Sequence, residues 1–156
     1  MRCEKCKYRF EALLGVGMMH DGVFDVLHLS SQERLKKLRI FIQDRAIAKQ
    51  TLILLEEGAT ADDYENELYA CPQCHRLYTR LYFRLHTEAK TYEPDYKCPH
   101  CSTLLKRTIL GLDADEPVIA QGVFCSVVYR DEPTVSVSCP KCGNNTWRYD
   151  TGILWD

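Results

Sequence analysis

The stretches Cys71-Pro72-Gln73-Cys74 and Cys98-Pro99-His100-Cys101 are two cysteine pairs of the form C-x-x-C, and 23 residues separate Cys74 from Cys98. Two intervening residues allow a tight turn to direct both sulfurs at one tetrahedral metal ion, about 2.3 Å from each. The 23 residues suffice for a strand, a turn and a returning strand, which is close to the usual gap between the halves of a zinc site. We therefore predict one metal site formed by Cys71, Cys74, Cys98 and Cys101.

Two further C-x-x-C pairs lie outside this stretch, Cys3/Cys6 and Cys139/Cys142. If the central pairs form one site, the outer pairs are left to form a second site of Cys3, Cys6, Cys139 and Cys142 that encloses the first. In the serial alternative, each outer pair joins the central pair nearest to it in the sequence. Four thiolates around one ion are typical of zinc, with iron as the alternative. We predict two Zn²⁺ ions per chain.

The overall composition favours a compact protein that keeps its cysteines reduced. Of the 156 residues, nine are cysteine, 46% are hydrophobic and 27% are charged, which is typical of a globular chain. The longest apolar run, Leu52–Leu55, is far shorter than the roughly 20 residues of a membrane-spanning helix. The first residues have no apolar segment of the secretory type. We expect a cytoplasmic protein without membrane association, in which disulfides are unfavourable.

The region between the first two cysteine pairs predicts one long helix. Ser30 and Glu33 have the spacing of a capping box, and apolar residues then recur every three or four positions until Gly58. A helix over about residues 31–57 would cover the sheet. The acidic residues 59–68 are interpreted as a short helix or a loop.

These elements combine into a predicted α+β fold. We expect two four-cysteine zinc ribbons with short antiparallel strands, covered by the long helix. Residues 1–156 would form a single compact domain. Its expected parts are an outer zinc-ribbon half made by residues 1–30 with 108–156, a helical insertion at 31–69, and an inner zinc ribbon at 70–107.

Residues 76–86 alternate with the period of a strand. One face carries Leu77, Leu81, Phe83 and Leu85, which we expect in the core. The other face is made of arginine, tyrosine and histidine: Arg76, Tyr78, Arg80, Tyr82, Arg84 and His86. Exposed arginines and tyrosines can bind phosphates and stack on unpaired bases. The alternative is that acidic residues of a neighbouring strand pair with the arginines.

The formal net charge of −2 conceals an uneven distribution. Residues 1–10 contain four basic and one acidic side chain, and residues 71–107 contain seven basic and three acidic ones. Residues 11–70 and 108–156 are acidic, with net charges of −5 and −4. The basic residues thus gather near the first three cysteine pairs. The acidic total argues against a nonspecific binder of duplex DNA.

No sequence motif indicates catalysis. The chain lacks H-E-x-x-H, G-x-S-x-G and a Gly-rich phosphate loop followed by Lys-Ser or Lys-Thr. Closed sites of four thiolates also leave no open position for a metal-bound water. Cys125 lies in the apolar run 122–129, and we interpret it as a buried free thiol. The alternative class is a thiol redox protein or small enzyme that uses a C-x-x-C pair or Cys125.

The segment from Cys3-Glu4-Lys5-Cys6 through Tyr8, Phe10 and Glu11 to Met18 resembles small bacterial zinc-ribbon proteins of unknown function. They begin with a cysteine knuckle and continue with an aromatic-Glu-Ala-Gly-x-Gly segment, and stretch 71–101 is similar to their ribbon. The pair Cys139/Cys142 is additional to their three-knuckle pattern. The resemblance implies zinc binding and no substrate. Zinc ribbons more broadly occur in transcription and translation factors, where they bind nucleic acid or a partner protein.

Taken together, the sequence predicts a noncatalytic zinc-binding module that acts as an adaptor or regulator. Its expected partner is a protein, or single-stranded or structured nucleic acid bound through the 76–86 face. A structural subunit of a larger assembly is a third possibility. The sequence leaves the oligomeric state open.

Overall fold

A computed structural model of the chain describes residues 1–15, 22–108, 137–145 and 147–148. In chain order the elements are β1 (Arg2–Cys3), α1 (Ser31–Phe41), α2 (Arg45–Glu56), β2 (Thr60–Ala70), β3 (Leu77–His86), β4 (Thr91–Tyr92), β5 (Lys106–Arg107) and β6 (Trp147–Arg148). They form a four-stranded antiparallel sheet of order β4-β3-β2-β5 and a two-stranded sheet of β1 and β6. The mixed helices and antiparallel strands agree with the predicted α+β class.

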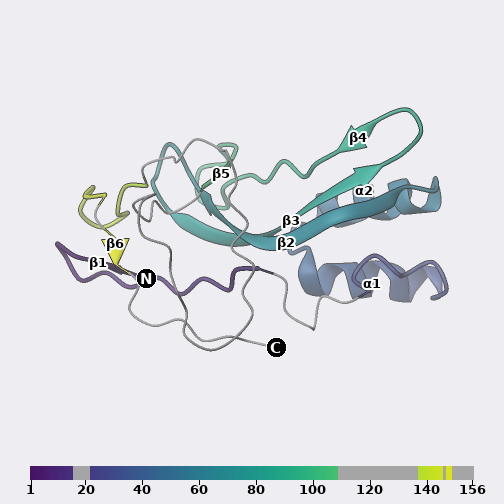
Figure 1. The fold of residues 1–156 in the computed structure, drawn as a ribbon, viewed down its shortest axis with the longest axis horizontal. Coiled ribbons are helices and arrows are strands. Elements are labelled where there is room, and N and C mark those ends of the chain that lie inside the picture. Colours follow the sequence, from purple (N-terminus) through teal and green to yellow (C-terminus); the bar gives the residue numbers. More distant parts are fainter. Residues whose placement is uncertain (16–21, 109–136, 146, 149–156) are drawn as a thin grey trace.

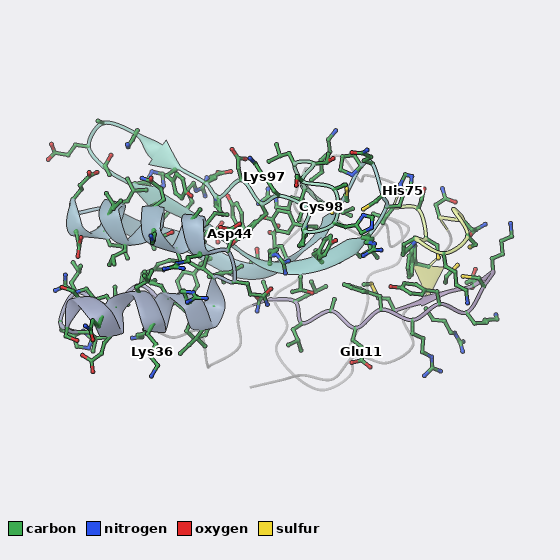
Figure 2. The ribbon with its side chains drawn as sticks, turned by 180° about the vertical axis from the view of Figure 1, so that it is seen from behind. Glu11, Lys36, Asp44, His75, Lys97 and Cys98 are labelled. Atoms are coloured by element: carbon green, nitrogen blue, oxygen red, sulfur yellow. The ribbon has the colours of Figure 1, made fainter. Side chains whose placement is uncertain are left out.

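The long ribbon of β2 and β3 joins two different ends of the molecule (Figure 1). The helices α1 and α2 lie along one end of this ribbon. The short β1–β6 sheet lies toward the other end. Seen from behind, Cys98 and His75 lie toward that second end and Lys36 of α1 at the opposite one (Figure 2).

The single helix predicted over residues 31–57 is wrong, because the chain forms two helices. Helix α1 begins with the predicted capping box of Ser30 and Glu33 and ends at Ile42, whose backbone is extended. Asp44 then starts α2, because its carboxylate accepts hydrogen bonds from the backbone N–H groups of Ala46 and Ile47 at 2.8 and 3.1 Å. Aspartate satisfies the free N–H groups of a helix start better than almost any other residue.

The break folds the two helices into an antiparallel pair (Figure 1). An ion pair of 2.8 Å between Arg34 and Glu56 joins the first turn of α1 to the last turn of α2. The buried residues Leu38 and Ile42 of the first arm and Ile47 and Leu54 of the second then reach the same core. One straight helix could not place its two halves side by side over this core.

Replacing Asp44 by Ala tests the helix break. We expect Asp44→Ala to lower the free energy of unfolding by about 0.5–2 kcal/mol, the usual cost of losing an N-cap side chain. Urea denaturation followed by circular dichroism measures this. Asp95→Ala, which removes an exposed carboxylate outside any helix, is the matched control and should change stability little. Equal stability of the two variants would contradict the capping role.

The prediction of a helix or loop for residues 59–68 is also wrong, because this acidic segment forms most of β2. Its carboxylates lie opposite the basic residues of β3, with Asp63 paired to Arg84 and Glu67 to Arg80 in the register. Opposite charges facing each other across two strands stabilise the pairing. The acidic residues of β2 are therefore complementary in charge to the basic residues of β3.

The main core lies between the helix pair and one face of the β2–β3 ribbon. The predicted inward side chains Leu81, Phe83 and Leu85 are buried there, and Phe24 packs its ring on Phe83 at a centroid distance of 5.1 Å. The inner cysteines Cys71 and Cys98 belong to the same cluster. The ribbon thus connects the helical core directly to the cysteine end.

A second, smaller core holds the outer segments against the ribbon. Leu68, Leu77 and Val137 are buried together, and Trp147 packs against them. The indole N–H of Trp147 donates to the carbonyl of Val137 at 2.9 Å. Residues 109–136, which include the apolar run 122–129, lie outside the described residues. In the part of the chain that the structure describes, neither helix has the length and apolarity needed to cross a membrane.

Candidate metal centres

The same backbone turn occurs at all four cysteine pairs. In each, the N–H of the residue after the second cysteine donates to the carbonyl of the first cysteine at 2.8–3.0 Å, and the N–H of the first cysteine donates to the carbonyl five positions later at 2.7–2.9 Å. The residue after the second cysteine has a positive φ every time: Lys7 60°, His75 57°, Ser102 60° and Gly143 70°. A positive φ at this position, which glycine adopts most easily, is therefore common to all four turns, and we call each turn a knuckle.

The knuckles meet in two groups of four sulfurs. Cys3, Cys6, Cys139 and Cys142 form the outer group, and Cys71, Cys74, Cys98 and Cys101 form the inner group. Within each group all sulfurs lie within 4.8 Å of one another. The grouping in the structure is thus the nested one and differs from the serial alternative. Cys125 lies outside the described residues.

The sulfur spacing fits a tetrahedral metal ion. Across the outer group the Sγ–Sγ distances are 3.7 Å for Cys3–Cys142 and 3.6 Å for Cys6–Cys139, and in the inner group Cys71–Cys101 is 3.4 Å. A zinc–sulfur distance of 2.3 Å implies tetrahedral edges of about 3.8 Å. A disulfide requires about 2.05 Å. The sulfurs are therefore too far apart to be bonded and close to the spacing that one shared ion imposes.

Without a cation, the thiols of one group differ widely in pKa. Backbone hydrogen bonds from Cys6 and Lys5 lower the pKa of Cys3 to about 7. Burial and the adjacent sulfurs of Cys6 and Cys3 raise the pKa of Cys139 to about 12. Because four thiolate charges repel one another at this spacing, a bound divalent cation is what would allow all four to ionise together.

Tyr78 makes a contact to the inner group that the sequence did not indicate. Its hydroxyl lies 3.3 Å from the Sγ of Cys98, and its ring carries the guanidinium of Arg80 at 5.1 Å from the centroid. Although burial alone would raise the pKa of Cys98, the hydroxyl of Tyr78 and the backbone of Cys101 lower it to about 6. Tyr78 thus favours the thiolate form of a metal ligand.

Removing the hydroxyl of Tyr78 should weaken metal binding at the inner group. Loss of a hydrogen bond to a ligand typically lowers metal affinity about 10- to 100-fold, and we expect Tyr78→Phe to fall in this range. Competition with a chromophoric zinc chelator measures the change. Tyr82→Phe is the matched control, because the hydroxyl of Tyr82 donates to Glu93 and not to a cysteine. An unchanged affinity in Tyr78→Phe would exclude this role.

Four of the five remaining residues of the predicted 76–86 face are engaged by other side chains of the chain. Arg80 donates to the side-chain oxygen of Gln43 at 2.8 Å, and the ring of Tyr82 is buried beneath the guanidinium of Arg107. Arg84 lies within 3.5 Å of Asp62, and His86 within 2.8 Å of the same carboxylate. This is the cross-strand pairing weighed as the alternative. Within the described part of the chain, Arg76 is the member of the six whose side chain forms no hydrogen bond or ion pair, and it is exposed.

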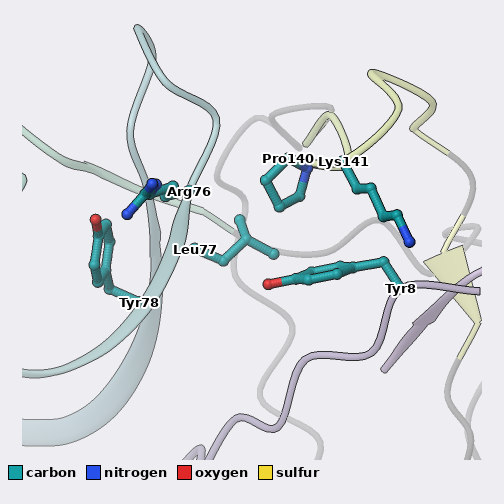
Figure 3. A pocket seen from close by; sticks show the side chains of 6 residues that line it. All are labelled: Tyr8, Arg76, Leu77, Tyr78, Pro140 and Lys141. Carbon is teal, nitrogen blue, oxygen red and sulfur yellow. The ribbon is translucent and has the colours of Figure 1, made fainter. Parts of the chain in front are cut away.

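Between the two groups lies a hollow of about 530 Å³. Three of the four knuckles contribute its lining, which is Tyr8, Arg76, Leu77, Tyr78, Pro140 and Lys141. The ring of Tyr8 lies beside Pro140 with its hydroxyl directed toward Leu77 (Figure 3). The hollow exists only where residues from both metal-site regions meet, so the sequence alone could not locate it.

Comparison with known proteins adds no relative to this description. No family model matches the chain, and no match is found among the curated proteins or the solved structures. The resemblance to zinc-ribbon proteins is accordingly supported by the two four-cysteine groups alone. Any function has to be argued from the chain's own residues.

Proposed function

We propose that the protein is a noncatalytic zinc-binding module that acts as an adaptor or regulator. Two zinc ions hold the knuckles together, and the surface between them binds a protein partner or a single-stranded or structured nucleic acid. The observation that carries this proposal is the meeting of four equivalent knuckles in two groups with sulfur spacings near a tetrahedral edge.

The sulfur environment supports a structural role for the metals. The first cysteine of each knuckle, at positions 3, 71, 98 and 139, is buried. Each group already supplies four thiolates, which complete a tetrahedral shell and leave no position for a reacting water. Thiolates held by a metal are also withdrawn from thiol exchange, which disfavours the redox alternative.

Metal analysis of the native protein tests the proposal. We expect two equivalents of zinc per chain and eight thiols that resist a thiol reagent in the native, zinc-loaded protein. Removal of zinc with a strong chelator should release these eight thiols. Nine rapidly titrating thiols and no metal would overturn the proposal in favour of the redox class. Two equivalents of iron would retain the binding module but change its ion.

A further inference from the structure

The knuckle end of the molecule carries an excess of positive side chains. The segments 2–9, 71–76, 97–102 and 139–144 contain seven lysines and arginines and one acidic residue, Glu4. Two zinc ions, each held by four thiolates, would contribute −2 apiece, which leaves this end with a small positive charge. The other residues that the structure describes carry a net charge of about −1, so within the described part of the chain the positive charge is concentrated at this end and favours an anionic ligand there.

The hollow at this end combines apolar side chains with cations. The buried side chain of Leu77 and the rings of Tyr8 and Pro140 form its apolar part. In the view of Figure 3, Arg76 lies on one side of these groups and Lys141 on the other. Both cations are exposed, and neither forms a hydrogen bond or ion pair through its side chain within the described residues. None of the described residues that line the hollow is a carboxylate.

The ring of Tyr8 is held in place by its contact with Trp147. It packs edge-on against Trp147 with a centroid distance of 6.2 Å and an interplanar angle of 73°. The knuckle that precedes Tyr8 fixes its backbone, since the carbonyl of Tyr8 accepts from the N–H of Cys3 at 2.8 Å. An aromatic ring that is already ordered loses little entropy when a ligand packs on it.

We propose that this hollow binds one unpaired nucleotide of a single-stranded nucleic acid. The base packs on Tyr8 beside Pro140, and the phosphates on its two sides contact Arg76 and Lys141. This assignment rests on the proposed function and names the ligand of that surface. The volume of about 530 Å³ lies within the range of roughly 300–1,000 Å³ that small-molecule sites occupy.

Two features favour a single strand over other anions. Cations on opposite sides of an apolar centre suit a phosphodiester backbone that continues past the base, whereas the phosphate of a free nucleotide needs cations that converge at one point. A base can enter the hollow only when it is unpaired, and aromatic rings bind unpaired bases of any sequence. The acidic total of the chain disfavours duplex binding.

Fluorescence anisotropy with labelled oligo(dT) and oligo(rU) tests the assignment on the zinc-loaded full chain. Stacking on one base contributes enough that Tyr8→Ala should weaken binding about 5- to 150-fold, while Tyr8→Phe should bind as the wild type. Arg76→Glu with Lys141→Glu should reduce the slope of log affinity against log salt by about 1.4. The matched control is Lys36→Glu with Arg39→Glu, the same charge change at exposed positions of α1.

The zinc content of the wild type distinguishes a failure of the nucleotide assignment from a failure of the proposed zinc-binding function. If the wild type holds two zinc ions but binds neither oligonucleotide at low salt, the nucleotide assignment fails and the zinc module stands. The assignment also fails if both double charge variants weaken binding equally, or if thymidine monophosphate or poly-glutamate competes as well as the oligomer. A preference between oligo(dT) and oligo(rU), with loss confined to the hollow variants, supports it and identifies the strand. A wild type without zinc overturns the proposed function on which it rests.

Discussion

Cys98→Ser is expected to unfold the main core, formed by the helix pair and the β2–β3 ribbon, at ordinary temperatures. Cys98 is buried in the same core as Leu81 and Phe83, so the inner metal and the helical core are one cooperative unit. A structural zinc contributes on the order of 10 kcal/mol to folding, which is comparable with the whole stability of a domain, about 5–15 kcal/mol. The variant should hold at most one metal and lose its cooperative thermal transition, as followed by elemental analysis and circular dichroism.

The control for this experiment is Cys125→Ser, which changes the cysteine outside both groups. It should retain two metals per chain. Because serine is close in size to cysteine, the loss in Cys98→Ser is assigned to the missing ligand and not to a cavity. A Cys98→Ser protein that melts cooperatively with two bound metals would show that the inner group is not a structural site.

Cys139→Ser should have a smaller and local effect. The outer group joins β1, β6 and the small core around Val137, and among the described residues none that is buried in the helical core comes from these segments. We expect one metal to remain, the helix pair and the β2–β3 ribbon to persist, and the knuckle end to open. The inner metal is therefore predicted to stabilise the helical core, and the outer metal to stabilise the knuckle end alone.

Trp147 provides the measurement for this second prediction. Its indole donates to Val137 and its ring contacts Tyr8, so opening of the outer group exposes it to water. In a Trp155→Phe background Trp147 is the single tryptophan, because the chain contains two. Cys139→Ser should shift its emission to the red while the far-ultraviolet circular dichroism changes little. Loss of the helical signal in this variant would contradict the division into two units.

Local patterns predicted the local structure well. The period-two alternation of Leu81, Phe83 and Leu85 correctly indicated a strand with one buried face, because neighbouring side chains of a strand must point to opposite sides. The capping box of Ser30 and Glu33 correctly placed the start of α1. Asp44 was an equally local signal for a second helix start, and a helical period that continued through it concealed the break.

The errors arose where the deciding contact is distant in sequence. The acidic segment 59–68 has no strand signal of its own, and its partner β3 supplies the opposite charges that make it a strand. For the polar face of residues 76–86 the sequence left open whether it is free or paired, because Asp62, Glu93 and Arg107, which engage it, lie elsewhere in the chain. The local sequence pattern around one residue does not include the distant residue that contacts it.

The sequence by itself determined that the chain has four knuckles, since two residues between cysteines and the turn that follows them are set by neighbouring backbone atoms. Only the tertiary structure decided which knuckles meet, because that depends on how the β2–β3 ribbon and the small core around Leu77 and Val137 bring distant segments together. The hollow between Tyr8, Arg76 and Lys141 has the same origin. Its three residues come from three knuckles and become one surface only after both groups of sulfurs have assembled.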